Sequence, residues 1–288
     1  MRANRNIVGV YGQERIDLID DTLSTVVGLR YSYFEGFGNH VTASASSAYS
    51  FQPTRTRLRV GYNEGFRPPA FDELFGVLGT STLQPESSYE IDAGVTQDIV
   101  PAVVTFAPTY FFRKTQNLIE DIAELPPVAG EPENLFVHNV GTVTAQGVEL
   151  ALGVHPTGWL TLTSDYTYLN TLTTEALLNR PRHRGRVIVA GQWENVLKPA
   201  DQMSATAMVQ AVGRRASPNP YDTASPFAPA PLSGYARVDL ALAYRFGGIW
   251  SAWSLTASVR NLFNHNYSES IGFPAPGANA LAGFRYGF

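Results

Sequence analysis

The chain has 288 residues, of which 44% are hydrophobic, 12% aromatic and 16% charged, and its formal net charge is −4. The charged fraction is low, because soluble domains usually contain about 25% charged residues. The absence of cysteine excludes a disulfide framework and thiolate metal sites, and the mild acidity argues against a nucleic-acid-binding surface. The longest uncharged apolar stretch, 99–112, contains Pro101 and Pro108 and is too short for a membrane-spanning helix. Residues 1–17 contain no apolar signal-peptide core, so we expect no export signal in this chain.

Strands with a period of two dominate the sequence. Along 89–95, for example, apolar residues alternate with Glu90, Asp92 and Gly94. Most strands are longer than the five or six residues usual in globular sheets and suit the ~9–11 tilted residues that cross a bilayer. Thirteen strands are predicted: 4–18, 22–35, 40–52, 55–66, 87–99, 102–116, 137–154, 158–170, 183–195, 202–213, 233–246, 251–264 and 277–288.

The connections alternate in length. Long loops are expected at 67–86, 117–136, 171–182, 214–232 and 265–276, and short turns at 53–54, 100–101, 155–157 and 247–248. Short turns on one side and long loops on the other are typical of outer-membrane barrels. Aromatic residues near the strand ends are candidates for the girdles at the two membrane interfaces: Tyr31, Tyr33, Tyr49, Phe51, Tyr62, Tyr110, Phe112, Tyr166, Tyr168, Tyr244 and Phe246. The pattern favours an all-β antiparallel transmembrane barrel over a soluble β-sandwich.

The final strand, 277–288, has an apolar stripe that includes Phe284, Tyr286 and Phe288. An aromatic carboxy-terminus on such a strand indicates a barrel-insertion signal, with the barrel-assembly machinery as its partner. Single bacterial chains normally form barrels with an even number of strands. If Phe288 lies on the periplasmic side, the long loops are extracellular and the first of the thirteen strands begins outside the cell. An odd number of strands with this orientation indicates the back portion of a larger barrel.

Five segments resemble one family, the TonB-dependent outer-membrane receptors. They occur in the expected order: GYNEGFRPPAFDELFG at 61–76, LQPESSYEIDAGV at 83–95, NVGTVTAQGVELAL at 139–152, NRPRH at 179–183 and SVRNLFNHNYSE at 258–269. The resemblance implies a barrel of 22 strands around a plug, of which residues 1–288 are the carboxy-terminal portion. The plug, the box that TonB reads and the early strands are not expected in this chain. Several of the motif residues, among them Gly147, Asn261 and Asn264, are interpreted as architectural.

The candidate ligand-binding residues fall into two groups. The first is basic and could attract an anionic solute or hold lipopolysaccharide phosphates: Arg180, Arg182, Arg184, Arg214 and Arg215. Its alternative interpretation is a wet lumen wall in which arginines face carboxylates. The second group is aromatic and could contact a bulky solute at the barrel mouth: Phe71, Phe75, Tyr221, Phe227 and Phe273. Its alternative is loop tips that pack only on each other.

The pattern shows no catalytic constellation, and we expect no enzyme activity, cofactor, metal site or nucleic-acid partner. The resemblance implies an outer-membrane receptor that takes up a scarce bulky solute, such as a ferric siderophore or a cobalamin. TonB would act through a plug outside this chain, and outer-membrane lipid and lipopolysaccharide would surround the barrel. A passive porin-like channel and a non-functional truncated barrel are the alternatives.

Overall fold

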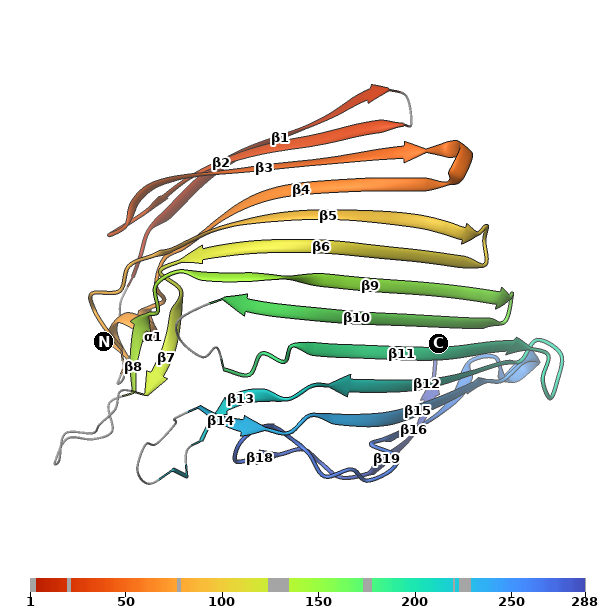
Figure 1. Ribbon diagram of the computed structural model, residues 1–288. Helices are drawn as coiled ribbons and strands as arrows, with labels where there is room; N and C mark the ends of the chain where they lie inside the picture. Colours follow the sequence, from red (N-terminus) through yellow and green to blue (C-terminus); the bar gives the residue numbers. More distant parts are fainter. Residues whose placement is uncertain are drawn as a thin grey trace.

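One antiparallel sheet of thirteen strands forms the body of the protein (Figure 1). The computed structural model describes residues 4–19, 22–76, 79–123, 135–172, 178–219, 221–222 and 229–287. The strands of the sheet, in order, are β1 (Ile7–Ile19), β2 (Leu23–Phe34), β3 (Gly38–Phe51), β4 (Thr56–Arg67), β5 (Glu86–Val100), β6 (Val104–Gln116), β9 (Val143–Thr157), β10 (Leu160–Leu172), β11 (His183–Glu194), β12 (Gln202–Val212), β15 (Tyr235–Arg245), β16 (Trp253–Arg260) and β19 (Asn279–Tyr286). The predicted all-β class and thirteen-stranded antiparallel sheet are confirmed. Within the described ranges β1 and β19 are the edges of the sheet and do not pair with each other.

The two ends of the strands differ. At one end, which we call the turn end, the connections that are described throughout are 52–55, 101–103, 158–159, 195–201 and 246–252, and they include the 3-10 helices η1 (Gln52–Thr54) and η2 (Gly248–Trp250). At the opposite end, the loop end, the long connections carry the helix α1 (Phe71–Phe75) and three small hairpins. These hairpins are β7 (Ile119–Ala123) with β8 (Leu135–Asn139), β13 (Arg215–Pro218) with β14 (Pro229–Leu232), and β17 (Ser268–Ser270) with β18 (Phe273–Pro274). In the described ranges no helix has the length and apolar character needed to cross a membrane.

Three sequence-based boundaries were wrong. The predicted strand 137–154 is two strands, because Gly141 adopts a φ of 76° and separates β8 from β9. The turn placed at 155–157 lies at 158–159, since β9 continues to Thr157. β16 ends at Arg260 instead of residue 264, because Asn261 turns the chain with a φ of 52°.

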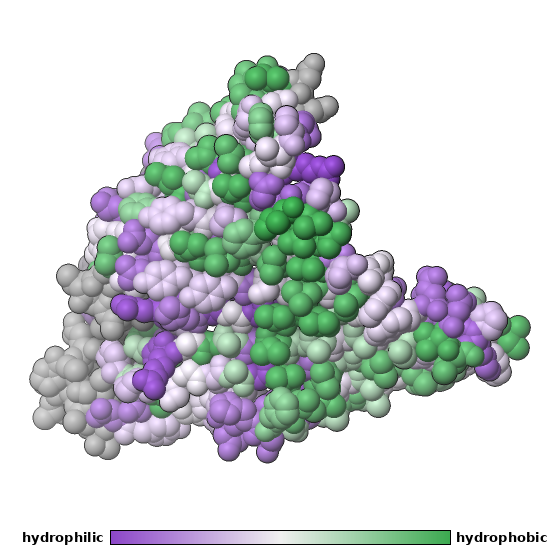
Figure 2. All heavy atoms as spheres, turned by 45° about the vertical axis from the view of Figure 1, so that its right-hand side comes forward, coloured by the Kyte–Doolittle hydropathy of each residue, from purple (hydrophilic) through white to green (hydrophobic). Residues whose placement is uncertain are grey.

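The side chains of each strand divide between two environments. On β4, the polar side chains of Arg57, Arg59 and Asn63 line a cavity on the concave face of the sheet. The alternate residues Leu58 and Val60 are 47% and 51% exposed, and Val60 also borders the cavity. The same division recurs across the sheet, and no second layer of described residues covers the exposed apolar face. Figure 2 shows hydrophobic atoms gathered in a band across the strands, with hydrophilic atoms beside it. Apolar side chains therefore face outward, as in a sheet whose convex face contacts hydrocarbon.

Aromatic rings gather near both ends of the strands. At the turn end Trp159 lies 5.5 Å from Trp193 and Trp253 stacks on Phe284 at 4.6 Å, centroid to centroid. Toward the loop end Tyr89 lies 6.3 Å from Tyr62, and the girdle candidate Phe112 follows at 6.1 Å. Rings that are apolar on the face and polar at the edge suit membrane interfaces. Tyr286 also contacts Trp253, whereas Phe288, the third residue of the predicted insertion signal, lies outside the described residues.

Gly147 on β9 is required by close packing. A β-carbon there would lie 1.9 Å from the Tyr168 carbonyl oxygen and 2.8 Å from the Phe111 ring. We therefore expect Gly147→Ala to reduce the free energy of unfolding by about 1–3 kcal/mol, as overpacking usually does. Gly153→Ala on the same strand is the control, since its nearest atom is 4.0 Å away. Urea unfolding of the two refolded variants measures the difference, and equal losses of stability would contradict the packing argument.

Candidate functional site on the concave wall and the loop end

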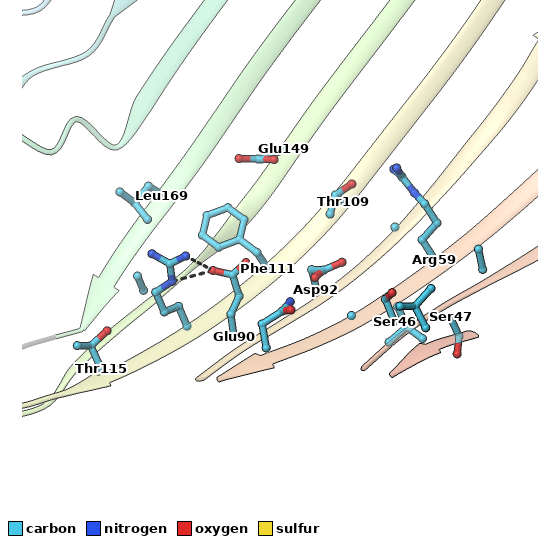
Figure 3. Close-up of a pocket in the computed structure, with 18 of the residues that line it drawn as sticks. Ser46, Ser47, Arg59, Glu90, Asp92, Thr109, Phe111, Thr115, Glu149 and Leu169 are labelled. Atoms are coloured by element: carbon cyan, nitrogen blue, oxygen red, sulfur yellow. Dashed lines mark hydrogen bonds and ion pairs between the residues drawn. The ribbon is translucent and has the colours of Figure 1, made fainter. Parts of the chain in front are cut away.

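The concave face of the sheet is hollowed by two polar cavities. The first has a volume of about 1030 Å³, and Figure 3 shows Arg59, Glu90, Asp92 and Glu149 directed into it from neighbouring strands. The second has a volume of about 760 Å³ and shares Arg59 and Glu149 with the first. Polar and charged side chains from β4 to β15 line these cavities, so the hollow is a polar surface that carries charges of both signs.

Arginines on this wall face carboxylates. Arg113 donates from Nε to Glu90 at 2.7 Å, and Arg186 donates from Nε to Asp165 at 2.9 Å. Arg180, a predicted ligand-binding residue, donates to Glu120 Oε1 at 2.6 Å. The arginine side chain of each pair is 39–57% exposed, so solvent screens the pair and it contributes little to stability. The pairs keep the wall close to neutral.

Some charges on the wall have no such partner. The side chains of Arg57, Arg59 and Arg184 form no hydrogen bond or ion pair within the part of the chain that the structure describes, and the same holds for the side chains of Asp92 and Glu149. Arg184 and Arg186 line the second cavity, as the alternation of their strand predicts. The wall thus offers free groups of both signs, which can hydrogen-bond a polar partner in the hollow.

At the loop end, Arg67 joins two loops. Its guanidinium donates to Glu86 at 2.7 and 2.9 Å and to Glu73 at 2.8 and 3.0 Å. Glu86 also accepts the Ile119 amide at 2.8 Å, and Glu73 accepts the Ala70 amide at 2.6 Å. Arg67 and Glu73, from the motif segment 61–76, and Glu86, from the segment 83–95, therefore hold the loop in place, which is an architectural role.

A small apolar core lies beneath this network and consists of Leu74, Leu83, Ile119 and Val137. Asn139 joins the same loops, because its side chain accepts the Gln84 amide and donates to the carbonyl oxygens of Gln84 and Asn117. Asn261 has a similar function farther along the chain, where its buried amide group binds the backbone of residues 265 and 276. The interpretation of Asn261 as architectural agrees with these bonds.

We expect Arg67→Met to loosen the loops at 67–86 and 117–119, because Glu86 would remain largely buried without its counter-charge. Loss of about 1.4 kcal/mol of local stability corresponds to roughly tenfold faster amide hydrogen exchange. Hydrogen exchange with mass spectrometry measures it in the refolded protein. Arg113→Met removes an ion pair from the open wall and is the control, so equal acceleration in both variants would count against the network.

The structure brings two of the aromatic candidates together, because the rings of Phe71 and Phe75 stack with their centroids 6.5 Å apart. Phe71 lies 4.9 Å beneath the Arg5 guanidinium, which also stacks on Phe37. Phe75 is 58% exposed, and Tyr221 and Phe273 are both more than 70% exposed at the tips of other loops. Phe227 lies outside the described residues. Phe71 and Phe75 therefore form one aromatic pair, and Tyr221 packs against Gly272 beside Phe273.

The basic candidates also separate. Arg215 is buried, and its Nη2 donates to the carbonyl oxygens of Ser268 and Glu269 at 3.0 and 2.7 Å. It thus connects the hairpin β13–β14 to the segment that contains β17. Arg182 and Arg214 are exposed at the loop end. Arg57, Arg59 and Glu149 were not among the sequence-based candidates, although their alternation with apolar neighbours is the signal that places them on the wall.

Comparison with known proteins decides the family. The family model described as TonB dependent receptor-like, beta-barrel, matches residues 1–262. The chain belongs to the TonB-dependent receptor family. The resemblance of the five motifs is confirmed, and homologues in this family are outer-membrane proteins of Gram-negative bacteria.

Solved structures share the fold at low identity. The copper transporter OprC has a TM-score of 0.76 at 16% identity, over 98% of this chain and 47% of that one. The ferripyoverdine receptor of Pseudomonas aeruginosa has a TM-score of 0.75 at 15% identity, over 98% and 38%. The FrpB iron transporter of Neisseria meningitidis has a TM-score of 0.72 at 16% identity, over 98% and 45%. The chain spans less than half the length of these relatives.

Proposed function

We propose that the chain is the carboxy-terminal barrel portion of an outer-membrane receptor that imports a bulky, scarce solute with energy supplied through TonB. The observation that carries the proposal is the sheet itself, whose convex face is apolar and whose concave face is a wide, charged hollow. Solved relatives are named as receptors or transporters of ferripyoverdine, ferric enterobactin, iron and copper. These names support an iron–siderophore complex as the solute, with a cobalamin as the second candidate of similar size.

In this proposal the loop end is extracellular and the turn end is periplasmic. Arg67, Glu86 and Asn139 hold the loops in defined positions, and the exposed rings of Phe75, Tyr221 and Phe273 provide apolar contact area for capture of the solute. The solute then passes along the concave wall when TonB acts on a plug that lies within the completed barrel. The transport step requires no covalent chemistry in this chain.

The proposal includes strands and a plug beyond those described here. The edge strands β1 and β19 have exposed backbone groups that are costly in hydrocarbon. Further strands that join these edges would satisfy those groups and complete the barrel. The unpaired charges Arg57, Arg59 and Glu149 would then face a filled lumen.

Uptake measurements test the function. A strain that carries the complete receptor gene is expected to accumulate at least one radiolabelled ferric siderophore or cobalamin, and a gene deletion should abolish this uptake. Removal of TonB or collapse of the proton gradient should have the same effect. Uptake that is indifferent to TonB and to the gradient would contradict the proposal.

The second candidate function is a passive channel, which the size of the hollow favours. Planar-bilayer conductance separates the two. A steady open pore formed by the refolded chain would support the channel, whereas the receptor proposal predicts no stable pore from these strands alone. A chain that is readily extracted from outer membranes would support the third alternative, a barrel portion that does not insert.

A further inference from the structure

A groove with a volume of about 430 Å³ crosses the convex face of the sheet between β10 and β16. Its floor consists of small residues, Gly191, Ala205, Ala207 and Ala257. Large apolar side chains border it: Leu160, Val189 and Trp193 on one side, and Leu240, Leu242 and Val259 on the other. The lining contains no charged side chain. A charged ligand would therefore find no side chain of opposite charge in this groove.

The strand register explains the shape of the groove. Gly191 lies opposite Ala205, and Ala205 lies opposite Leu242 on the next strand. One row farther from the turn end, Val189 pairs with Ala207, and Ala207 with Leu240. Two alanines on β12 thus lie between Val189 and Gly191 on β11 and the branched side chains of Leu240 and Leu242 on β15. The resulting channel is a feature of the pleated surface and does not depend on a loop.

Trp193 forms the end of the groove nearest the turn end. A β-carbon on Gly191 would lie 2.3 Å from the Trp193 ring, so the six-membered ring of the indole occupies the space beside this glycine. Trp159 lies beside it at 5.5 Å. All four tryptophans of the sequence, Trp159, Trp193, Trp250 and Trp253, are within or next to turn-end connections. Indole rings favour the interface between headgroups and hydrocarbon, so this end of the groove is placed at headgroup depth.

We propose that this groove is a binding site for one acyl chain of a membrane lipid, whose headgroup lies beside Trp193 at the turn end. The groove is continuous with the apolar convex face, which is the surface that contacts hydrocarbon in the proposed function, and the inference rests on that membrane location. An acyl chain is flexible and apolar, so it can enter a narrow groove that the flat surface of a partner protein would cover without filling. An acyl chain in the groove makes van der Waals contacts with the glycine and alanine residues of the floor, which would otherwise have no apolar neighbour on that side.

Native mass spectrometry of the protein refolded in phosphatidylcholine nanodiscs is the test. We expect one phospholipid to remain bound after mild detergent extraction. Ala207→Leu fills the groove and should remove the bound lipid, whereas Ala45→Leu, on the outward face of β3, should retain it. Circular dichroism must show intact sheet in both variants, and Ala205→Leu is a second groove-filling variant if Ala207→Leu does not refold. Equal retention in the filled and control variants would overturn the proposal, as would a stable dimer that covers the groove.

Single-tryptophan variants separate this proposal from the proposed function. In liposomes of brominated phosphatidylcholine, Trp193 should be quenched strongly in the parent and less in the Ala207→Leu background. Trp253 should be quenched equally in both. If Trp253 is quenched and Trp193 is not, the lipid site in the groove is rejected, whereas the proposed membrane location is retained. If neither is quenched, the convex face does not contact lipid, and the membrane location fails together with the lipid site.

Discussion

Asp201→Asn is expected to destabilise the turn end more than any other single carboxylate replacement. Asp201 is fully buried in the connection 195–201. Its carboxylate accepts the backbone amides of residues 196–198 at 2.6–2.9 Å and the Tyr244 hydroxyl at 2.6 Å. In Asp201→Asn, the side-chain NH₂ group replaces one carboxylate oxygen and faces at least one of these N–H or O–H donors. That contact becomes repulsive, and the buried donor is left without an acceptor.

The pH dependence of this site has a defined sign. Burial raises the pKa of the Asp201 carboxyl, but the hydrogen bonds from Tyr244 and the three amides outweigh it, and the pKa lies below its ordinary value of 3.8. A lowered pKa in the folded state gives a stabilisation that is present above the unfolded pKa and is lost as pH falls through the folded pKa. The parent should therefore lose stability below about pH 4, and Asp201→Asn should lose less over the same interval.

Thermal unfolding followed by circular dichroism, at several pH values from neutral to acidic, measures both effects. Asp98→Asn is the matched control, since Asp98 also lies at the turn end and accepts one side-chain bond, from the Thr105 hydroxyl. We expect the midpoint of Asp201→Asn to fall well below that of Asp98→Asn at neutral pH. Identical midpoints, or an acid transition unchanged by the loss of Asp201, would contradict the role of this carboxylate.

Val60→Arg is the second substitution with a large expected effect. Val60 is half exposed and alternates with Arg59 and Gly61 on β4, so its side chain points to the convex face although the residue also borders the concave cavity. The proposed membrane location places hydrocarbon at this face. An arginine near the midplane of a bilayer costs a barrel about 2–4 kcal/mol. Ser46→Arg on the neighbouring strand is the control, because Ser46 lines the concave cavity in Figure 3 and its replacement meets water.

Urea unfolding in phospholipid bilayers provides the comparison. We expect the loss of stability to be confined to Val60→Arg, with Ser46→Arg within about 0.5 kcal/mol of the parent, as for ordinary surface changes. The reverse order, or equal effects, would mean that the two faces of β4 do not differ in environment.

The alternation of apolar and polar residues with a period of two predicts most of the fold. It predicts the thirteen strands, their antiparallel order and the outward direction of residues such as Leu58 and Val60, because one buried or lipid-facing side imposes alternation on the sequence. It does not predict the small hairpins at the loop end. Residues 137–139 alternate like a barrel strand, yet they pair with β7, and residues 140–142, where Gly141 has a positive φ, separate them from β9.

The candidate site was only partly predictable. Arg184 follows from alternation, and the basic residue Arg215 was conspicuous in the sequence, but its burial against the carbonyl oxygens of residues 268 and 269 depends on contacts between distant loops. Asp201 has no local signature, since its partner Tyr244 lies 43 residues away. Contacts of this kind are set by tertiary structure and cannot be read from a pattern of single residues.

Site-directed spin labelling along β4 tests the central claim most directly, because the sequence has no cysteine to remove. Single cysteines at positions 57–62 are labelled in the bilayer-embedded protein, and collisions with oxygen and with a water-soluble nickel complex are compared. The account predicts that labels at 58, 60 and 62 collide with oxygen and that those at 57, 59 and 61 collide with nickel. Labels that show no alternation, or that are shielded from both reagents on the apolar side, would contradict it.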